Sequence, residues 1–202
     1  LPEFKRSVLE TLRQPIESGV VTISRASGSF DFPCEFILLA AMNPCPCGHY
    51  GDRMHTCRCG QRRIQDYRAK ISGPLLDRID LHVEVSSLTD NELLHAPAGE
   101  TSAQIRARVI RARERQKERF SGRPAVRCNA RMEPSDLARF CAIQPEAKAH
   151  LRHTINEFGL SARAYDRILR VARTIADLDG AEQIASDHIF EAVNYRSLDR
   201  RL

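Results

Sequence analysis

The sequence lacks a hydrophobic run long enough to cross a membrane. Its longest uninterrupted apolar stretch is Phe36–Met42, whereas a spanning helix needs about 20 such residues. The N-terminus has no basic-then-apolar signal pattern, and the chain begins at Leu1 without an initiator methionine. We therefore expect a cytoplasmic protein with no membrane partner, and a chain that is truncated or processed.

The composition shows no sign of disorder. Of the 202 residues, 42% are apolar and 28% are charged, which is ordinary for a globular chain with one medium domain or two small ones. The seven cysteines are an odd number, and four of them lie close together. This distribution favours a reduced compartment and a metal over a disulfide framework.

The N-terminal part mixes helical and β-strand patterns. Apolar residues recur at helical spacing over Leu1–Glu17, and the runs Val20–Arg25 and Ser29–Phe32 predict a short hairpin. Phe36–Met42 has no polar alternation and predicts a strand buried on both faces, while residues 79–85 alternate and predict a strand at a sheet edge. Two such strands cannot cover each other, so the sheet is expected to need strands that this sequence does not supply.

The remainder of the chain is predicted to be helical, after a polar boundary at residues 95–99. The predicted helices are Ser102–Phe120, Pro134–Phe140, Pro145–Phe158, Ala162–Leu178 and Ser186–Tyr195, with Ser161 and Ser186 as N-caps. The fold class expected is α/β plus all-α. A partial α/β domain over residues 1–90, with a cysteine-loop insertion, precedes a helical domain over residues 91–202.

Four local patterns occur in one order: Ala40–Pro44, Gly73–Asp80, Leu160–Ala164 and Val171–Leu178. Together they resemble the magnesium-chelatase-like AAA+ ATPases of the ComM/YifB type, and the resemblance runs over essentially the whole chain. It implies the C-terminal part of a P-loop-type AAA+ domain, followed by a helical lid domain. Neither a phosphate-binding loop nor a Walker B acidic pair is present in this sequence, so we expect this chain alone to be inactive as an ATPase.

The resemblance assigns three residues to an ATP site that also holds Mg²⁺. Asn43 matches sensor 1, Arg78 matches an arginine finger that acts on a neighbouring subunit, and Arg163 matches sensor 2 of the lid. Each residue also has an ordinary interpretation. Asn43 can begin an Asn-Pro turn, and Arg163 can be a surface arginine. Arg78 can pair within its own domain with Asp77 or Asp80.

Two Cys-x-Cys pairs are separated by nine residues and consist of Cys45, Cys47, Cys57 and Cys59. Four thiolates on two tight turns can close a tetrahedral zinc site, although Cys-x-x-Cys is the commoner spacing. His49 and His55 can replace one ligand. The alternative is a reduced loop without metal.

Basic charge is concentrated in two segments. Residues 106–119, which include Arg106 and Arg113, hold seven basic side chains against two acidic ones, and a second excess lies beside the cysteine loop. Such clusters are typical of polyanion binding, although a charged helix is more often a solvated face. In the family resemblance the hairpin can line a central pore, which makes Arg25 a candidate contact to a phosphate backbone. DNA binding is then expected to depend on salt rather than on base sequence.

The leading hypothesis is a hexameric ring ATPase that moves along DNA as a branch-migration helicase in recombination and natural transformation. A motor subunit that inserts magnesium into a porphyrin is the second hypothesis, and the cysteine loop argues against it. The third is a nonenzymatic, zinc-bearing module that binds nucleic acid.

Overall fold

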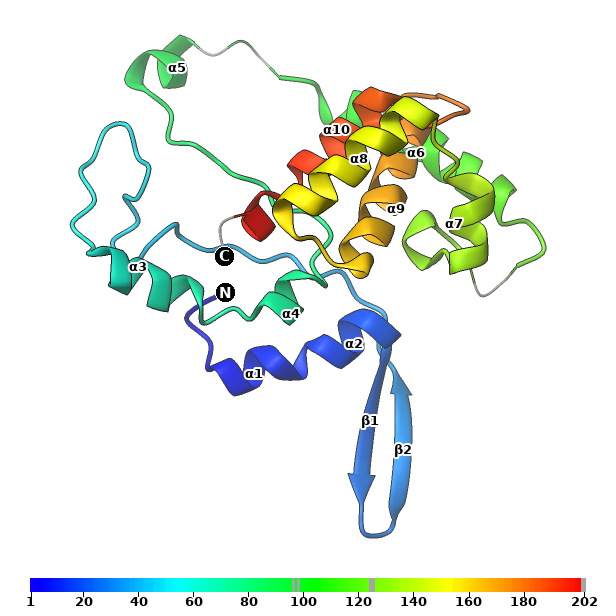
Figure 1. Cartoon of the computed structure of the whole chain (residues 1–202), viewed down its shortest axis with the longest axis horizontal. Helices are drawn as coiled ribbons and strands as arrows, with labels where there is room; N and C mark the ends of the chain where they lie inside the picture. Colours follow the sequence, from blue (N-terminus) through cyan, green and yellow to red (C-terminus); the bar gives the residue numbers. More distant parts are fainter. Residues whose placement is uncertain (96, 98, 124–125, 201–202) are drawn as a thin grey trace. The chain divides into compact units, whose positions relative to one another are not determined.

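The computed structural model describes residues 1–95, 97, 99–123 and 126–200, which form two compact units (Figure 1). The first unit contains residues 1–79 and 84–95, and the second contains residues 80–83 and the described residues from 97 to 200. The sequence predicts two family domains, 1–90 and 91–202. These domains are defined differently from the two compact units, and they stay a prediction.

The first unit begins with two short helices, α1 (Arg6–Thr11) and α2 (Arg13–Ser18), where the sequence predicts one helix over Leu1–Glu17. Pro15 has no N–H to donate to the carbonyl of Thr11, and its ring crowds that carbonyl, so a continuous helix is interrupted one turn earlier. Within α2, Pro15 lies in the first turn, where an N–H has no helical partner in any case. The helix ends at Gly19, which has a φ of 68°.

The predicted hairpin is confirmed. Strands β1 (Val20–Arg25) and β2 (Gly28–Pro33) pair antiparallel, with Val20 opposite Pro33 and Arg25 opposite Gly28. Figure 1 shows this ribbon extending from the end of α2. Its side chains are largely exposed, so it is held by its own ladder rather than by a hydrophobic core.

The prediction of two sheet strands is wrong for the described residues. Residues 34–60 and 77–89 contain neither helix nor strand. Ile37 and Leu39, expected in a buried strand, are 95% and 94% exposed. A strand is stabilised by hydrogen bonds to a neighbour, and the two strands of the hairpin pair only with each other in the part of the chain that the structure describes. Without a partner strand, the apolar run Phe36–Met42 forms no strand, and Ile37 and Leu39 remain exposed to solvent.

Three more helices belong to the first unit: α3 (Gln61–Arg68), α4 (Gly73–Leu76) and α5 (Asp90–His95). Its buried side chains come from several short elements and include Leu9, Ile64, Ile71, Leu75 and Leu76. The irregular segment that carries the four clustered cysteines leads directly into α3.

The second unit is helical, as predicted. It consists of α6 (Ser102–Arg119), the 3₁₀ turn η1 (Asn129–Arg131), α7 (Pro134–Phe140), α8 (Pro145–Phe158), α9 (Ala162–Leu178), α10 (Ser186–Asn194) and the 3₁₀ turn η2 (Ser197–Arg200). Ser161 caps α9 by accepting a hydrogen bond from the Ala164 N–H, whereas Ser186 is the first residue of α10 rather than its cap. The chain as described is thus about half helical with a two-stranded sheet.

Helix α9 is the centre of the second unit. Ile168, Ala172 and Ala176 on this helix are fully buried and pack in one hydrophobic cluster with residues from α7, α8 and α10. None of the helices among the described residues is long and apolar enough to cross a membrane.

Candidate functional site

The four clustered cysteines converge on one point in the first unit. The Cys45 Sγ lies 3.3 Å from that of Cys47 and 3.7 Å from that of Cys57, and the Sγ atoms of Cys47 and Cys57 are 3.7 Å apart. All four sulfur atoms, including that of Cys59, lie within 4.8 Å of one another. With Zn–S bonds of about 2.3 Å, the edge of a tetrahedral site is about 3.8 Å, so the thiols match the dimensions of a zinc site.

Tight turns bring the two pairs together. The Gly48 N–H donates to the Cys45 carbonyl at 3.0 Å, and Gly48 has a φ of 86°, which a residue with a side chain rarely adopts. On the other side, the Cys59 N–H points to the Cys57 Sγ at 3.5 Å. Cys45 is fully buried and Cys47 is exposed, so the cluster lies at the surface with one wall closed.

The thiols differ in how readily they ionise. Backbone N–H groups of His49 and Arg58 lower the pKa of Cys47 to about 6. The Cys59 N–H favours the Cys57 thiolate, but burial and the neighbouring thiols outweigh it and raise the pKa of Cys57 to about 11. Thiols this close cannot all carry negative charge without a cation between them. The donor set therefore suits a divalent metal that prefers sulfur.

Asn43 lies just before the cysteine loop and is exposed. It follows the irregular segment 34–42 instead of the end of a strand. Its backbone lies beside the phenol of Tyr67, whose pKa is raised by burial first and by the charge of Glu3 second. The Asn43 side chain faces solvent, so its role as sensor 1 stays a prediction.

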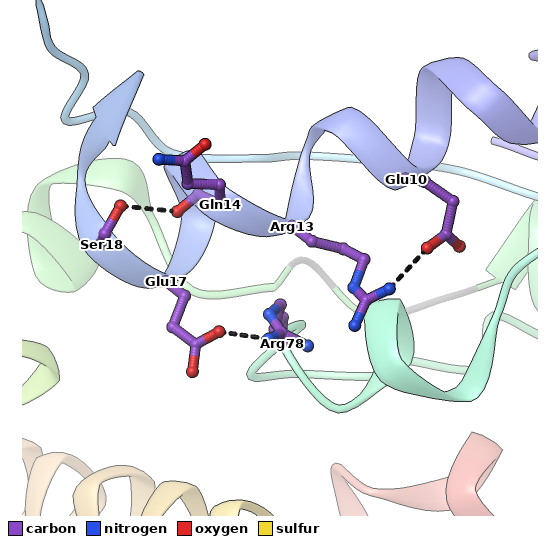
Figure 2. Close-up of a pocket in the computed structure, with 6 residues that line it drawn as sticks. All are labelled: Glu10, Arg13, Gln14, Glu17, Ser18 and Arg78. Atoms are coloured by element: carbon purple, nitrogen blue, oxygen red, sulfur yellow. Dashed lines mark hydrogen bonds and ion pairs between the residues drawn. The ribbon is translucent and has the colours of Figure 1, made fainter. Parts of the chain in front are cut away.

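Arg78 is buried, with 7% of its surface exposed, immediately after α4. Its Nη1 donates to the Pro74 carbonyl at 2.6 Å, and its Nη2 pairs with the carboxylate of Glu17 at the end of α2. Figure 2 shows the two side chains facing each other in a hollow of about 420 Å³. The hollow is also lined by Glu10, Arg13, Gln14 and Ser18.

Sequence reasoning missed Glu17 as the partner of Arg78. It considered Asp77 and Asp80, because they are adjacent in the chain. Asp80 instead pairs with Arg167 of α9 within the second unit. Glu17 is 61 residues away from Arg78, and no local pattern in the sequence signals such a pair.

Arg163 lies in the first turn of α9 and is exposed. The other two arginines of this region are structural: Arg167 pairs with Asp80, and Arg173 is buried against Asp177. The structure leaves Arg163 at the surface of the second unit, and its role as sensor 2 stays a prediction. Asn43 and Arg78 are in the first unit and Arg163 is in the second.

The basic helix α6 has two kinds of arginine. Arg119 is bound to Asp177 at 2.5 Å, and Arg108 forms two hydrogen bonds with Glu100 at 2.8 and 2.9 Å. Arg106 and Arg113 are exposed, as is Arg25 at the end of β1. Some arginines of α6 therefore form ion pairs within the protein, whereas Arg106 and Arg113, the candidates for nucleic-acid binding, face solvent.

Two family models match this chain almost end to end. The model for magnesium chelatase, subunit ChlI, covers residues 1–93, and the model for its C-terminal part covers residues 99–196. The chain belongs to the magnesium-chelatase-like AAA+ family. The resemblance noted from the sequence motifs is thereby confirmed.

Relatives of the same family are similar over the full length of this chain. It is 45% identical to the competence protein ComM of Haemophilus influenzae, over 100% of this chain and 38% of that protein. It is 43% identical to YifB of Salmonella typhimurium and 41% identical to YifB of Escherichia coli, in each case over 100% of this chain and 39% of the relative. The chain thus spans about two fifths of the length of these family members.

Proposed function

We propose that the whole protein is a ring-forming, hexameric AAA+ ATPase that couples the hydrolysis of Mg²⁺-ATP to movement along DNA. The observation that carries this proposal is the 45% identity to ComM over the entire chain. That relative's name, a competence protein, supports a branch-migration helicase in recombination and natural transformation as the activity proposed here. Such a protein works in the cytoplasm, where the clustered thiols stay reduced.

In this proposal three residues respond to ATP that is bound mainly by other parts of the protein. Asn43 offers an amide donor and acceptor to the attacking water and the γ-phosphate, and Arg163 links the nucleotide to the lid. Arg78 acts on the ATP of the neighbouring subunit, where a permanently charged planar fork stabilises charge that develops during phosphoryl transfer. The chain described here supplies none of the phosphate-binding loop.

The pair with Glu17 sets a condition on the proposed role of Arg78. A carboxylate and a γ-phosphate both offer oxygens to the same guanidinium fork, so the two anions compete for it. Arg78 reaches a neighbouring phosphate only when Nη2 leaves Glu17. Glu17 therefore holds the finger in the hollow of Figure 2 while no nucleotide is presented to it.

DNA contact in the proposal is made by Arg25 of the hairpin and by Arg106 and Arg113 of α6. Their exposure supports contacts to phosphate. Binding is then expected to follow backbone charge and to weaken steeply with salt.

We also propose that Cys45, Cys47, Cys57 and Cys59 hold a structural Zn²⁺ ion. Four thiolates complete the coordination shell of the zinc ion, so the metal stabilises the loop and takes no part in ATP hydrolysis. Protein purified without chelator is expected to contain at least one zinc per chain by elemental analysis, and Cys57→Ser is expected to lower that content by about one zinc per chain.

The matched control for the zinc experiment is Cys34→Ser, which changes a partly buried cysteine outside the cluster. It is expected to leave the zinc content unchanged. Substoichiometric zinc that is indifferent to Cys57→Ser rules the site out.

A second candidate is a motor subunit of magnesium chelatase, which the description of the matching family models supports. A strand-displacement assay with the full-length protein separates the candidates. The helicase is expected to displace a strand with ATP and to fail with a nonhydrolysable analogue. ATP hydrolysis without displacement favours the chelatase motor, and salt-dependent DNA binding without hydrolysis favours a nonenzymatic zinc-bearing module.

A further inference from the structure

A second group of metal-ligating side chains lies in the same loop, between the two cysteine pairs. It consists of His49, Asp52 and His55, whose ligand atoms all lie within 4.8 Å of one another. The Asp52 Oδ2 is 3.6 Å from the His49 Nδ1 and 3.5 Å from the His55 Nδ1. Both imidazoles therefore present Nδ1 to one carboxylate oxygen, and their ring centroids are 4.8 Å apart.

These separations are too long for good hydrogen bonds but suit ligands of one cation. An N–H···O hydrogen bond has its donor and acceptor within about 3.2 Å. Zinc binds imidazole nitrogen and carboxylate oxygen at about 2.1 Å, which places two ligand atoms of a tetrahedral site about 3.4 Å apart. The observed distances of 3.5 and 3.6 Å are close to that edge.

The other oxygen of Asp52 is already occupied, and this fixes the carboxylate. Its Oδ1 accepts hydrogen bonds from the Met54 N–H at 2.7 Å, the His55 N–H at 3.2 Å and the Ser87 hydroxyl at 3.3 Å. Oδ2 is left to face the two imidazoles. Metal-binding carboxylates are commonly oriented in this way by hydrogen bonds to the oxygen that does not bind the metal.

The charge of the group is also suitable. An aspartate carboxylate is ionised at neutral pH and supplies the negative charge that a divalent cation requires. Two neutral imidazoles and one carboxylate form a ligand set that zinc and similar divalent cations prefer, with one position left for water.

We propose that His49, Asp52 and His55 bind a second divalent cation of the Zn²⁺ class, separate from the four-cysteine site and open to solvent at one coordination position. Both histidines and the carboxylate come from the short loop between the two cysteine pairs. Metal binding at the four-cysteine site and metal binding at this site therefore order the same segment.

The test is a calorimetric titration of the tag-free full chain with Zn²⁺, together with Co²⁺ absorption spectra. Two ions per chain are expected. Cobalt in the cysteine site gives intense thiolate charge-transfer bands, whereas cobalt bound to nitrogen and oxygen gives only weak bands. His55→Ala is expected to remove the second binding event and leave the thiolate bands unchanged. Its side chain is 65% exposed, so this variant should fold.

His49→Ala provides an independent variant, and it is expected to give the same loss. His153→Ala is the matched control, because His153 is an exposed histidine of α8 beside Glu157. It should retain both ions. One ion in the wild type, a second event that survives His55→Ala, or an equal loss in His153→Ala overturns the proposal.

Discussion

Asp177 in α9 is the most heavily bonded carboxylate among the described residues of the helical unit. Its side chain is fully buried. The Arg119 guanidinium donates hydrogen bonds to both of its oxygens at 2.5 and 2.7 Å, and the Asn129 amide donates one at 2.8 Å. Arg173 approaches from one turn earlier on the same helix. This one carboxylate therefore ties α6 and η1 to α9.

Replacing Asp177 by asparagine is expected to destabilise the helical unit by about 3 kcal/mol, because buried guanidinium groups lose their counter-charge. The measurement is urea unfolding followed by circular dichroism. Glu157→Gln, at an exposed pair on α8, should change stability by less than about 0.5 kcal/mol. Equal stability of the Asp177→Asn variant and the wild type contradicts the assignment.

The same residue predicts a dependence on pH. Burial alone raises the pKa of Asp177, but hydrogen bonds from Arg119 and Asn129 outweigh it and hold the pKa below its usual value. A lowered pKa in the folded state means that the stabilisation is present above pH of about 4 and is lost as the pH falls further. The difference between the wild type and Asp177→Asn should therefore shrink in acid, and a difference that grows there contradicts this account.

At the scale of elements, the apolar side of α6 is only partly covered. Ala112 and Phe120, which follows the last residue of the helix, are buried, whereas Ile105 and Val109 toward the N-terminus of the helix remain 43% and 42% exposed. The sequence places these four residues on one side of the helix, and the fold covers only part of that side. The exposed apolar residues and the exposed Arg106 and Arg113 are available for a partner.

A double variant, Arg106→Gln with Arg113→Gln, tests whether that partner is DNA. Each lost phosphate contact is expected to reduce the slope of log affinity against log salt by about 0.9, so the double variant should reduce it by about 1.8. The measurement is fluorescence anisotropy over a range of salt concentrations. Lys148→Gln, at an exposed position of α8, is the matched control, and an unchanged slope in the double variant removes α6 from the interface.

Elements were predicted well where the local pattern was sufficient. The ranges of α7, α8 and α9 agree with the sequence prediction, because proline at the start, a capping residue and apolar periodicity are all local. The two sheet strands failed because a strand depends on a neighbour that its own residues do not encode.

At the scale of the whole molecule, the proposed ATP site is shared between subunits. The chain spans 38% of the length of ComM, so the proposed site combines residues of this chain with others outside it. In the proposed function, the exposed Asn43 and Arg163 and the buried Arg78 contribute to such a site, which forms only in the full-length ring.

Sharing across subunits predicts complementation between two inactive full-length proteins. Arg78→Ala is expected to lower ATP hydrolysis about 10³-fold, as the loss of an arginine finger does. Mixing it with a variant that lacks the phosphate-loop lysine should restore part of the activity, because some interfaces then combine an intact loop with an intact Arg78. Steady-state phosphate release measures the outcome.

Arg13→Ala is the control for this mixture, since Arg13 lines the same hollow and pairs only locally with Glu10 among the contacts shown in Figure 2. It should remain active without complementation. If Arg78→Ala is inactive and no mixture regains activity, Arg78 does not act across subunits.

The sequence by itself determined the family, the helices of the second unit, the hairpin and the proximity of the four cysteines, because each depends on spacing along a short segment. Only the tertiary structure decided that Arg78 pairs with Glu17, that Asp177 joins three elements, and that Asp52 directs one oxygen toward two histidines. These contacts depend on where the chain returns in space. A charge or hydrogen-bond donor in the sequence does not specify its partner until packing has excluded water and fixed the direction of each side chain.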